Sequence, residues 1–198
     1  MSKNKSVVLA ERYARAYGLE ISAYPNYLAP STPFRELVPE GSIVVGAVDN
    51  AATRRLLHER LSVYEDVVYV DAGNAAAQAL SERPTHEELA RVLETGWEGQ
   101  VVCGVRKEHR TVLPFPADAF PDLVEGEDRL PTEAPCGEAV VSQPQRHLTN
   151  VMAATVVLSY LTPLLTDGTV LHHKSFFDAR RGYLRSEAAI QLLDQVRV

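Results

Sequence analysis

Two apolar segments of the sequence are each followed by an aspartate, and these aspartates are the first candidates for chemistry. The segment Ser42–Gly46 precedes Asp49 and Asn50, and the segment Val67–Val70 precedes Asp71. In open α/β sheets, ligands bind at the carboxyl ends of the strands near a topological switch point. There Asp49 could hold a metal ion bound to a nucleotide phosphate, and the Asn50 amide could donate a hydrogen bond to the same ligand. The alternative is that Asp49 simply caps the helix that follows.

Lys5 and Cys136 are two further candidates, each with an ordinary structural alternative. Lys5 lies near the start of a predicted helix, where its ammonium group could meet a phosphate oxygen; otherwise it is a solvated lysine. Cys136 lies in the sequence Pro-Cys-Gly on the approach to a helix. Backbone amides there can lower the pKa of a thiol and make it nucleophilic, although an isolated cysteine more often only packs.

The other cysteine and a histidine pair are interpreted as structural. Cys103 follows Val101 and Val102 in an apolar run, and burial there raises the pKa of a thiol rather than activating it. His172 and His173 are adjacent, and adjacent strand residues point to opposite faces, so the two are poorly placed to hold one metal ion. With only two cysteines, far apart in the sequence, neither a zinc clip nor a disulfide framework is expected.

Strands and helices alternate along the first half of the chain, which predicts an α/β fold. Apolar spacing predicts a helix over residues 6–17, and alternation over 19–24 predicts a half-buried strand before a Pro-rich loop. A strand, a turn and a helix are predicted from 42 to 61, and further strands at 67–70 and 99–104. We expect a sheet that is parallel at its centre and mixed beyond.

The second half of the chain is less regular. Short helices are predicted at 75–80 and 87–93, and the Pro-, Asp- and Glu-rich residues 107–135 predict a long, mobile crossing loop. Residues 147–165 are apolar nearly all round, which predicts a buried core helix with part of it at an interface. Two strand-like runs at 169–173 and 175–177, followed by turn residues at 178–182, predict a terminal hairpin.

Length and charge limit the class of protein. The 198 residues predict a single domain, 1–198. The net charge is −6, and residues of both signs are spread along the sequence without the basic stripe that nucleic-acid binding requires. No run reaches the roughly 20 apolar residues of a membrane span, and the first residues are polar. We therefore expect a cytoplasmic protein that binds neither nucleic acid nor membrane.

Five segments stand in a characteristic order along the chain: 4–10 (NKSVVLA), 46–54 (GAVDNAATR), 69–74 (YVDAGN), 99–102 (GQVV) and 134–138 (APCGE). Together they resemble the ThiF and ubiquitin-activating-enzyme superfamily of ATP-dependent adenylating proteins. The likeness extends to the ThiF-like proteins of bacterial PRTRC gene clusters, through Gln143-Pro-Gln and Thr149-Asn150 ahead of a long apolar helix. The resemblance implies a Rossmann-like mixed sheet of the ThiF/MoeB type.

The resemblance also implies an activity and its residues. Members of the family attach the C-terminal carboxylate of a ubiquitin-like or sulfur-carrier protein to the α-phosphate of ATP. Lys5 is then expected to contact the ATP phosphates, Asp49 to position magnesium, and Asn50 and Arg54 to shape the nucleotide pocket. Cys136 falls near the place where activating enzymes of the superfamily carry a thioester cysteine.

One part of the family pattern is absent from the sequence. The family opens with a strand, a Gly-rich phosphate loop and a helix ahead of the lysine, and no such loop occurs here. We therefore expect an N-terminally truncated version of the fold: a shortened enzyme, a split subunit, or a relative that binds a partner without adenylating it. Missing strands would leave an open sheet edge and apolar helix surface, which predicts a homodimer or a paired subunit.

Overall fold

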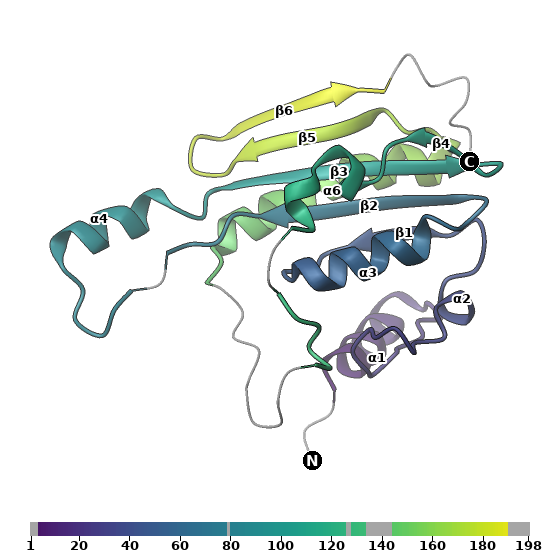
Figure 1. Ribbon diagram of the computed structural model, residues 1–198, viewed down its shortest axis with the longest axis horizontal. Helices are drawn as coiled ribbons and strands as arrows, with labels where there is room; N and C mark the ends of the chain where they lie inside the picture. Colours follow the sequence, from purple (N-terminus) through teal and green to yellow (C-terminus); the bar gives the residue numbers. More distant parts are fainter. Residues whose placement is uncertain (1–3, 79, 126–127, 134–143, 190–198) are drawn as a thin grey trace.

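The structure is a computed structural model that describes residues 4–78, 80–125, 128–133 and 144–189. These residues form a mixed α/β structure around one open six-stranded sheet (Figure 1). The strand order is β1-β2-β3-β5-β6. The sixth strand, β4, is not part of this linear order and pairs with β3. The strands are β1 (Ile43–Gly46), β2 (Val67–Asn74), β3 (Glu98–Lys107), β4 (Arg110–Leu113), β5 (His172–Asp178) and β6 (Tyr183–Ala188).

The expectation of a parallel centre is wrong. Among the strands that the structure describes, only β1 and β2, at one edge of the sheet, run parallel, and the other pairs are antiparallel. A parallel pair needs a crossover, and α3 (Ala51–Leu61) supplies one between β1 and β2. By contrast α4 (His86–Glu94), between β2 and β3, has no buried residue and projects away from the sheet (Figure 1). The chain therefore returns into β3 antiparallel to β2.

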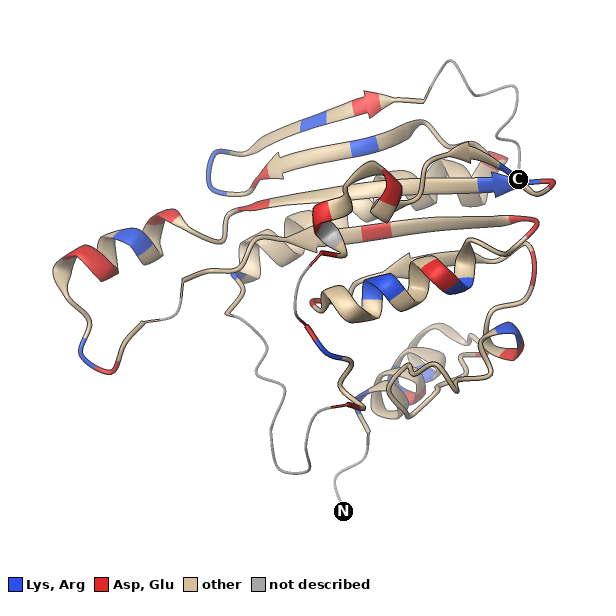
Figure 2. Cartoon of the chain, in the orientation of Figure 1, with Lys and Arg blue, Asp and Glu red and all other residues tan. Residues whose placement is uncertain are grey.

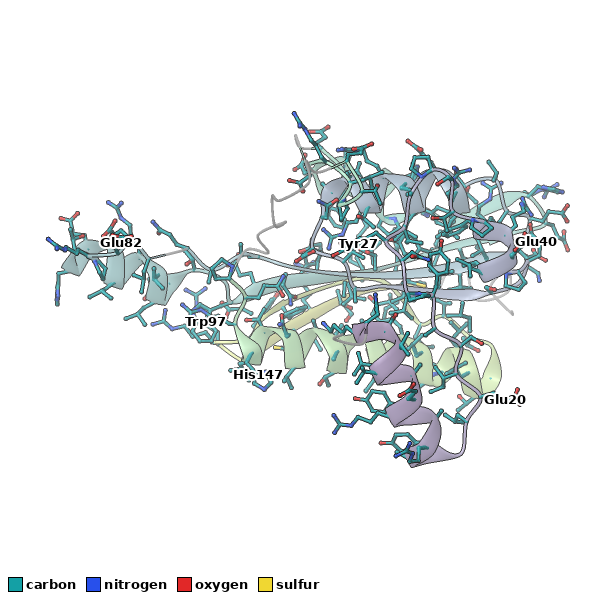
Figure 3. The ribbon with its side chains drawn as sticks, turned by 90° about the horizontal axis from the view of Figure 1, so that it is seen from below. Glu20, Tyr27, Glu40, Glu82, Trp97 and His147 are labelled. Atoms are coloured by element: carbon teal, nitrogen blue, oxygen red, sulfur yellow. The ribbon has the colours of Figure 1, made fainter. Side chains whose placement is uncertain are left out.

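Helices cover both faces of the sheet. The alternation of β2 divides its side chains: Val68 and Val70 pack with α6 (His147–Asp167), whereas Val67 and Tyr69 pack with α3. The short α2 (Phe34–Leu37) and α5 (Pro116–Ala119) contribute Phe34 and Phe115 to the cluster on the α3 side. Figure 3 shows α1 (Lys5–Tyr17) on the same side of the sheet as α6.

The N-terminal helix is confirmed as α1, but the strand expected at residues 19–24 is wrong. Asn4 caps α1 by accepting from the Ser6 amide, and Gly18 ends it at φ 66°. The segment after Gly18 pairs with no neighbouring strand, and Ile21 is 41% exposed. It is held instead by isolated hydrogen bonds; for example, Asn4 Nδ2 donates to the Pro25 carbonyl oxygen at 2.9 Å. An alternating pattern without a partner strand does not make a strand.

Several other expectations need correction. Residues 75–80 form no helix where they are described, whereas the helix expected at 87–93 is confirmed as α4. The segment expected as a loop at 107–135 contains β4, α5 and the 3₁₀ turn η1 (Pro121–Leu123). The terminal hairpin around the turn at 178–182 is confirmed, but the two runs at 169–173 and 175–177 were wrongly expected as separate strands: they merge into one strand, β5, which starts at His172. The other strand of the hairpin is β6, which was not predicted.

The long apolar helix is confirmed as α6, although it is buried on one side only. Its buried residues include Ala153, Val156 and Tyr160, which face the sheet, while Leu158 and Leu165 are 59% and 71% exposed. By length and composition α6 is the one helix of the described chain that could cross a membrane, a test that core helices of soluble proteins also pass. The packing of α6 against β2, β3 and β5 is that of such a core helix.

Candidate functional site

A cavity of about 760 Å³ lies where the parallel strands β1 and β2 end. Small-molecule sites in proteins are commonly about 300–1,000 Å³. Apolar walls come from β1 and α6, for example Val45 and Val157. The polar side chains of the lining are Lys5, Asp49, Arg54, Asn74, Gln145 and Asn150. A cavity at the carboxyl ends of these strands is where an open α/β sheet is expected to bind a ligand.

Three of the predicted site residues meet in this cavity. Lys5 comes from the first turn of α1, Asp49 from the turn after β1, and Arg54 from α3. Asn50 is not among the lining residues, and Cys136 lies outside the described residues. The fold therefore brings together one ammonium group, one carboxylate and one guanidinium group from separate elements.

The guanidinium group of Arg54 is held in place by the protein. Its Nε donates to Asp71 Oδ2 at 3.1 Å, and its terminal nitrogen donates to the carbonyl oxygens of Val48 and Ala72. The Arg54 side chain is 12% exposed and that of Asp71 is 1% exposed. Arg54 thus fixes the turn after β1 against the end of β2, and it sets the shape of the cavity wall.

Asp71 was expected in a loop after Val70, but it lies inside β2 and is buried. Burial raises the pKa of the Asp71 carboxyl group, while Arg54 and the Tyr69 hydroxyl act in the opposite direction. The Tyr69 hydroxyl donates to Asp71 Oδ1 at 3.0 Å, and burial raises the pKa of Tyr69 as well. Asp71 is therefore an internal partner of Arg54 rather than a ligand-binding group.

Gly46 leaves the room that this buried network needs. A Cβ atom at Gly46 would lie 2.3 Å from Asp71 Oδ1 and 2.9 Å from the Tyr69 hydroxyl oxygen, which is closer than real contacts allow. The last residue of β1 must therefore lack a side chain, because the Tyr69–Asp71 hydrogen bond occupies that space.

Asn50 has a structural role at the start of α3. Its Oδ1 accepts from the Thr53 amide at 2.9 Å, which makes Asn50 the N-cap, and its Nδ2 donates to the Arg129 carbonyl at 3.1 Å. The carboxylate at this helix end comes from Asp128, whose Oδ2 accepts from the Ala51 amide at 3.0 Å. The cap that was considered for Asp49 is therefore supplied by its neighbour, and Asp49 lines the cavity.

The far wall of the cavity is α6, which is fixed at its N-terminal end. The Thr149 hydroxyl donates to the Gly96 carbonyl at 2.8 Å, and the Arg146 guanidinium group lies 4.1 Å from the centre of the Trp97 ring. Asn150 accepts from Asn74 Nδ2 at 2.6 Å, which joins α6 to the end of β2 across the cavity. The Oδ1 atom of Asn74 is buried and has no hydrogen-bond partner among the described residues.

The cavity contains one carboxylate, and that is compatible with magnesium bound through a nucleotide. Within the described part of the chain, no group of three or more His, Cys, Asp or Glu residues is placed to hold a metal ion. Magnesium, however, is usually held by one or two carboxylates together with substrate phosphates rather than by an all-protein cage. Asp49 with a bound nucleoside triphosphate fits that pattern.

Comparisons with models of known protein families and with curated proteins give no match.

Three polar residues of the cavity had no assigned role in the sequence analysis: Asn74, Gln145 and Asn150. Each lies in a segment on which the family resemblance rests, and this was the feature of the sequence that could have pointed to them as site residues. The sequence did not show that these three residues meet in one cavity, because β2 was expected to end at Val70, before Asn74. Cys103 is confirmed as core: it is fully buried, and burial raises its pKa to about 12.

Proposed function

We propose that this chain is the catalytic domain of a ThiF-like, ATP-dependent adenylyltransferase that activates the C-terminal carboxylate of a ubiquitin-like or sulfur-carrier protein. The observation that carries the proposal is that Lys5, Asp49 and Arg54, from three separate elements, line one cavity at the carboxyl ends of β1 and β2. These are the residues that the resemblance assigns to ATP phosphates, magnesium and the nucleotide pocket.

Each of the three residues has a distinct part in the proposed site. Lys5 supplies a mobile positive charge for phosphate oxygens. Asp49 holds the magnesium ion that accompanies the nucleotide. Arg54 is a positioning residue, because Asp71 and two carbonyl oxygens already occupy its guanidinium group.

The proposed reaction is an in-line displacement at phosphorus. A carboxylate oxygen of the partner's C-terminus bonds to the α-phosphorus, and the bond between that phosphorus and the bridging oxygen of pyrophosphate breaks. The products are an acyl-adenylate and pyrophosphate. Lys5 and the magnesium ion at Asp49 would stabilise the negative charge on the phosphate oxygens during this step. Cys136 stays a candidate to receive the acyl group as a thioester with release of AMP.

Calorimetric titration of the chain with ATP and magnesium tests the proposal. We expect micromolar affinity, about −8 kcal/mol, and at least a tenfold loss in Asp49→Ala. Asp122→Ala, which removes an exposed carboxylate from η1, is the matched control and should bind like the wild type. Absence of ATP binding by the wild-type chain and by both variants would overturn the proposal for the isolated chain.

A second candidate function is a split subunit or partner-binding module that does not adenylate by itself. One observation favours it: within the described residues β1 pairs only with β2, so its other edge is open, and Val45 in this strand is 45% exposed and lines the cavity. A strand from another polypeptide could add to this edge and bring backbone amides to the phosphates. ATP binding that appears only in the presence of a partner would select this function.

A further inference from the structure

A second cavity lies beside the β5–β6 hairpin. Its volume is about 730 Å³, and its lining comes from the end of β2, the start of β3 and both strands of the hairpin. This volume falls in the range of small-molecule sites. We call it the hairpin cavity; the side chains on which its chemistry depends are Glu98, Gln100, Phe176, Asp178 and Tyr183.

These five side chains lie on one face of the sheet, because the strand pairing aligns them. In the antiparallel register Glu98 lies opposite Asp178, and Asp178 lies opposite Tyr183. Gln100 lies opposite Phe176 in the next row of the same face. Side chains alternate along a strand, and the residue between Phe176 and Asp178 belongs to the cluster that packs with α6. The hairpin cavity is therefore on the face of the sheet opposite α6.

The two carboxylates of the hairpin cavity differ in what they already bind. Asp178 belongs to the hairpin turn: its Oδ1 accepts from the amides of Arg180 and Arg181, both at 2.9 Å, and its Oδ2 lies 3.5 Å from Arg181 Nη1. Glu98 has no hydrogen-bond or ion-pair partner for its side chain within the described residues. Like charges directly opposite each other on two strands are destabilising, so the sheet gains nothing from a carboxylate at Glu98.

The amide of Gln100 is also available to a ligand. Its side chain lies over Gly73 of β2, where a Cβ atom would be 2.8 Å from Gln100 Nε2. The absence of a side chain at Gly73 gives the Gln100 amide its place. No other described residue forms a hydrogen bond with this amide. The hairpin cavity thus has one free carboxylate and one free amide side by side on β3.

Two aromatic rings complete the lining. The ring of Phe176 is half-buried and meets the ring of Phe120 edge to face, with the centroids 5.6 Å apart. Tyr183 is 51% exposed. A guanidinium group stacks on aromatic faces and donates two parallel hydrogen bonds to a carboxylate. Aromatic rings beside an unmatched carboxylate and a free amide oxygen are the contacts that an arginine side chain makes.

The charges around the hairpin cavity set the sign of its ligand. Figure 2 shows red at the start of β3 and at the end of β5, and blue in the turn that joins β5 to β6. Arg181 of this turn lines the cavity, but its charge is matched by Asp178. Arg185 lies on the same face of β6 and is not part of the lining. The unmatched charge in the lining is that of Glu98, and it calls for a cation.

We propose that the hairpin cavity binds the arginine side chain of a protein partner. The guanidinium group pairs with Glu98, donates to the amide oxygen of Gln100 and lies against the aromatic lining. Lysine fits less well, because its ammonium group is a point charge that cannot form paired hydrogen bonds. Asn74 lines both this cavity and the cavity at β1 and β2, so a segment bound here lies beside the proposed ATP site. The proposal adds a recognition site to the proposed function and does not depend on it.

Titration with capped peptides, followed by two-dimensional NMR of the isotope-labelled chain without ATP, tests the proposal. One peptide has a single arginine among alanines, and the other has citrulline in its place, which keeps the shape of the side chain but has no charge. We expect the arginine peptide to bind in the millimolar range and to shift the amide signals of Glu98, Gln100 and Tyr183. The citrulline peptide should bind about tenfold more weakly, because a charge-assisted hydrogen bond is lost.

Three variants show which groups bind the arginine. Glu98→Gln should lower the affinity for the arginine peptide about tenfold and leave that for the citrulline peptide unchanged. Tyr183→Leu removes a ring but keeps apolar surface, and should weaken the arginine peptide by about threefold. Glu82→Gln removes an exposed carboxylate ahead of α4 and is the matched control, which should bind the arginine peptide like the wild type.

The proposal is overturned by any of three results. The first is a folded NMR spectrum that does not change at millimolar concentrations of the arginine peptide. The second is equal affinity for the arginine and citrulline peptides. The third is an equal loss in Glu82→Gln and Glu98→Gln, which would indicate general attraction to the net charge of −6. None of these titrations contains ATP, so the proposal and the proposed function can fail independently.

Discussion

Arg54 Nε lies 3.1 Å from Asp71 Oδ2, and this ion pair joins α3 to the interior of β2 beside the cavity. Both side chains are largely withdrawn from solvent. Removal of one partner from such a pair leaves the other as an uncompensated buried charge, and the cost of that is much larger than the loss of a surface ion pair.

Arg54→Ala should therefore lower the free energy of unfolding by about 3–5 kcal/mol, as measured by urea denaturation. Arg54→Met combined with Asp71→Asn should lose less than the sum of the two single changes, because the double variant has neither charge and keeps an acceptor for Tyr69. Arg91→Ala removes an exposed i,i+4 pair with Glu87 and should cost no more than about 0.5 kcal/mol. Equal losses in Arg54→Ala and Arg91→Ala would contradict the structural role of Arg54.

Asn50→Ala should separate the capping role of Asn50 from a direct role in nucleotide binding. Loss of the N-cap should lower the free energy of unfolding by about 1 kcal/mol, and Asn50→Ser should restore most of it. ATP affinity should change little in both variants, because Asn50 does not line the cavity. A tenfold loss of ATP affinity in Asn50→Ala, with unfolding unchanged, would show instead that Asn50 contacts the ligand.

Lys5→Gln should weaken ATP binding by about tenfold or more, because charge-assisted hydrogen bonds contribute about 1.5–3 kcal/mol. Unfolding should be unaffected, since Lys5 lies in the first turn of an exposed helix. Lys107→Gln is the control: it removes the same charge from a surface pair with Asp66. Equal ATP affinities for both variants would exclude a phosphate contact by Lys5.

Cys103 predicts a pH dependence with a defined sign. Burial raises its pKa from 9.0 to about 12, so the unfolded chain loses this proton first as the pH rises. Its contribution to stability is fully present below about pH 9 and is lost between pH 9 and 12. The free energy of unfolding of the wild type should fall more steeply than that of Cys103→Ala over this range, by up to about 1.4 kcal/mol per pH unit. Parallel curves for the two proteins would contradict a protonated, buried thiol.

Part of the fold follows from local patterns in the sequence. The spacing from Lys5 to Tyr17, the apolar run before Gly46 and the hairpin turn at Gly182 gave elements that the structure confirms, because each pattern acts within a few residues. The alternation at residues 19–24 misled, because a strand exists only where another strand pairs with it. The direction of β3 could not be predicted either, since it depends on α4 projecting from the sheet instead of crossing it.

The candidate site was predictable to a similar degree. Asp49 was placed correctly at the end of a strand, and Lys5 and Arg54 were assigned by resemblance. The burial of Asp71 was not predicted, since a polar residue after four apolar ones is typical of the end of a strand. Its charge is tolerated inside β2 because Arg54, on another element, and the Tyr69 hydroxyl both donate to it. Such a pair depends on the packing of α3 on the sheet, which no local pattern encodes.

The pairing of β3 with β5 sets the order in which the molecule can assemble. It joins Gly99 to Phe177, and all of α6, with its cavity residues Asn150 and Val157, lies inside the loop that this pairing closes. Contacts between distant parts of a chain form slowly, because the loop entropy is lost before the contact is gained. The β5–β6 hairpin should therefore appear early in refolding, and the cavity last. A chain emerging from the ribosome would have no complete cavity until α6, which follows β3 in the sequence, had packed on β2 and β3.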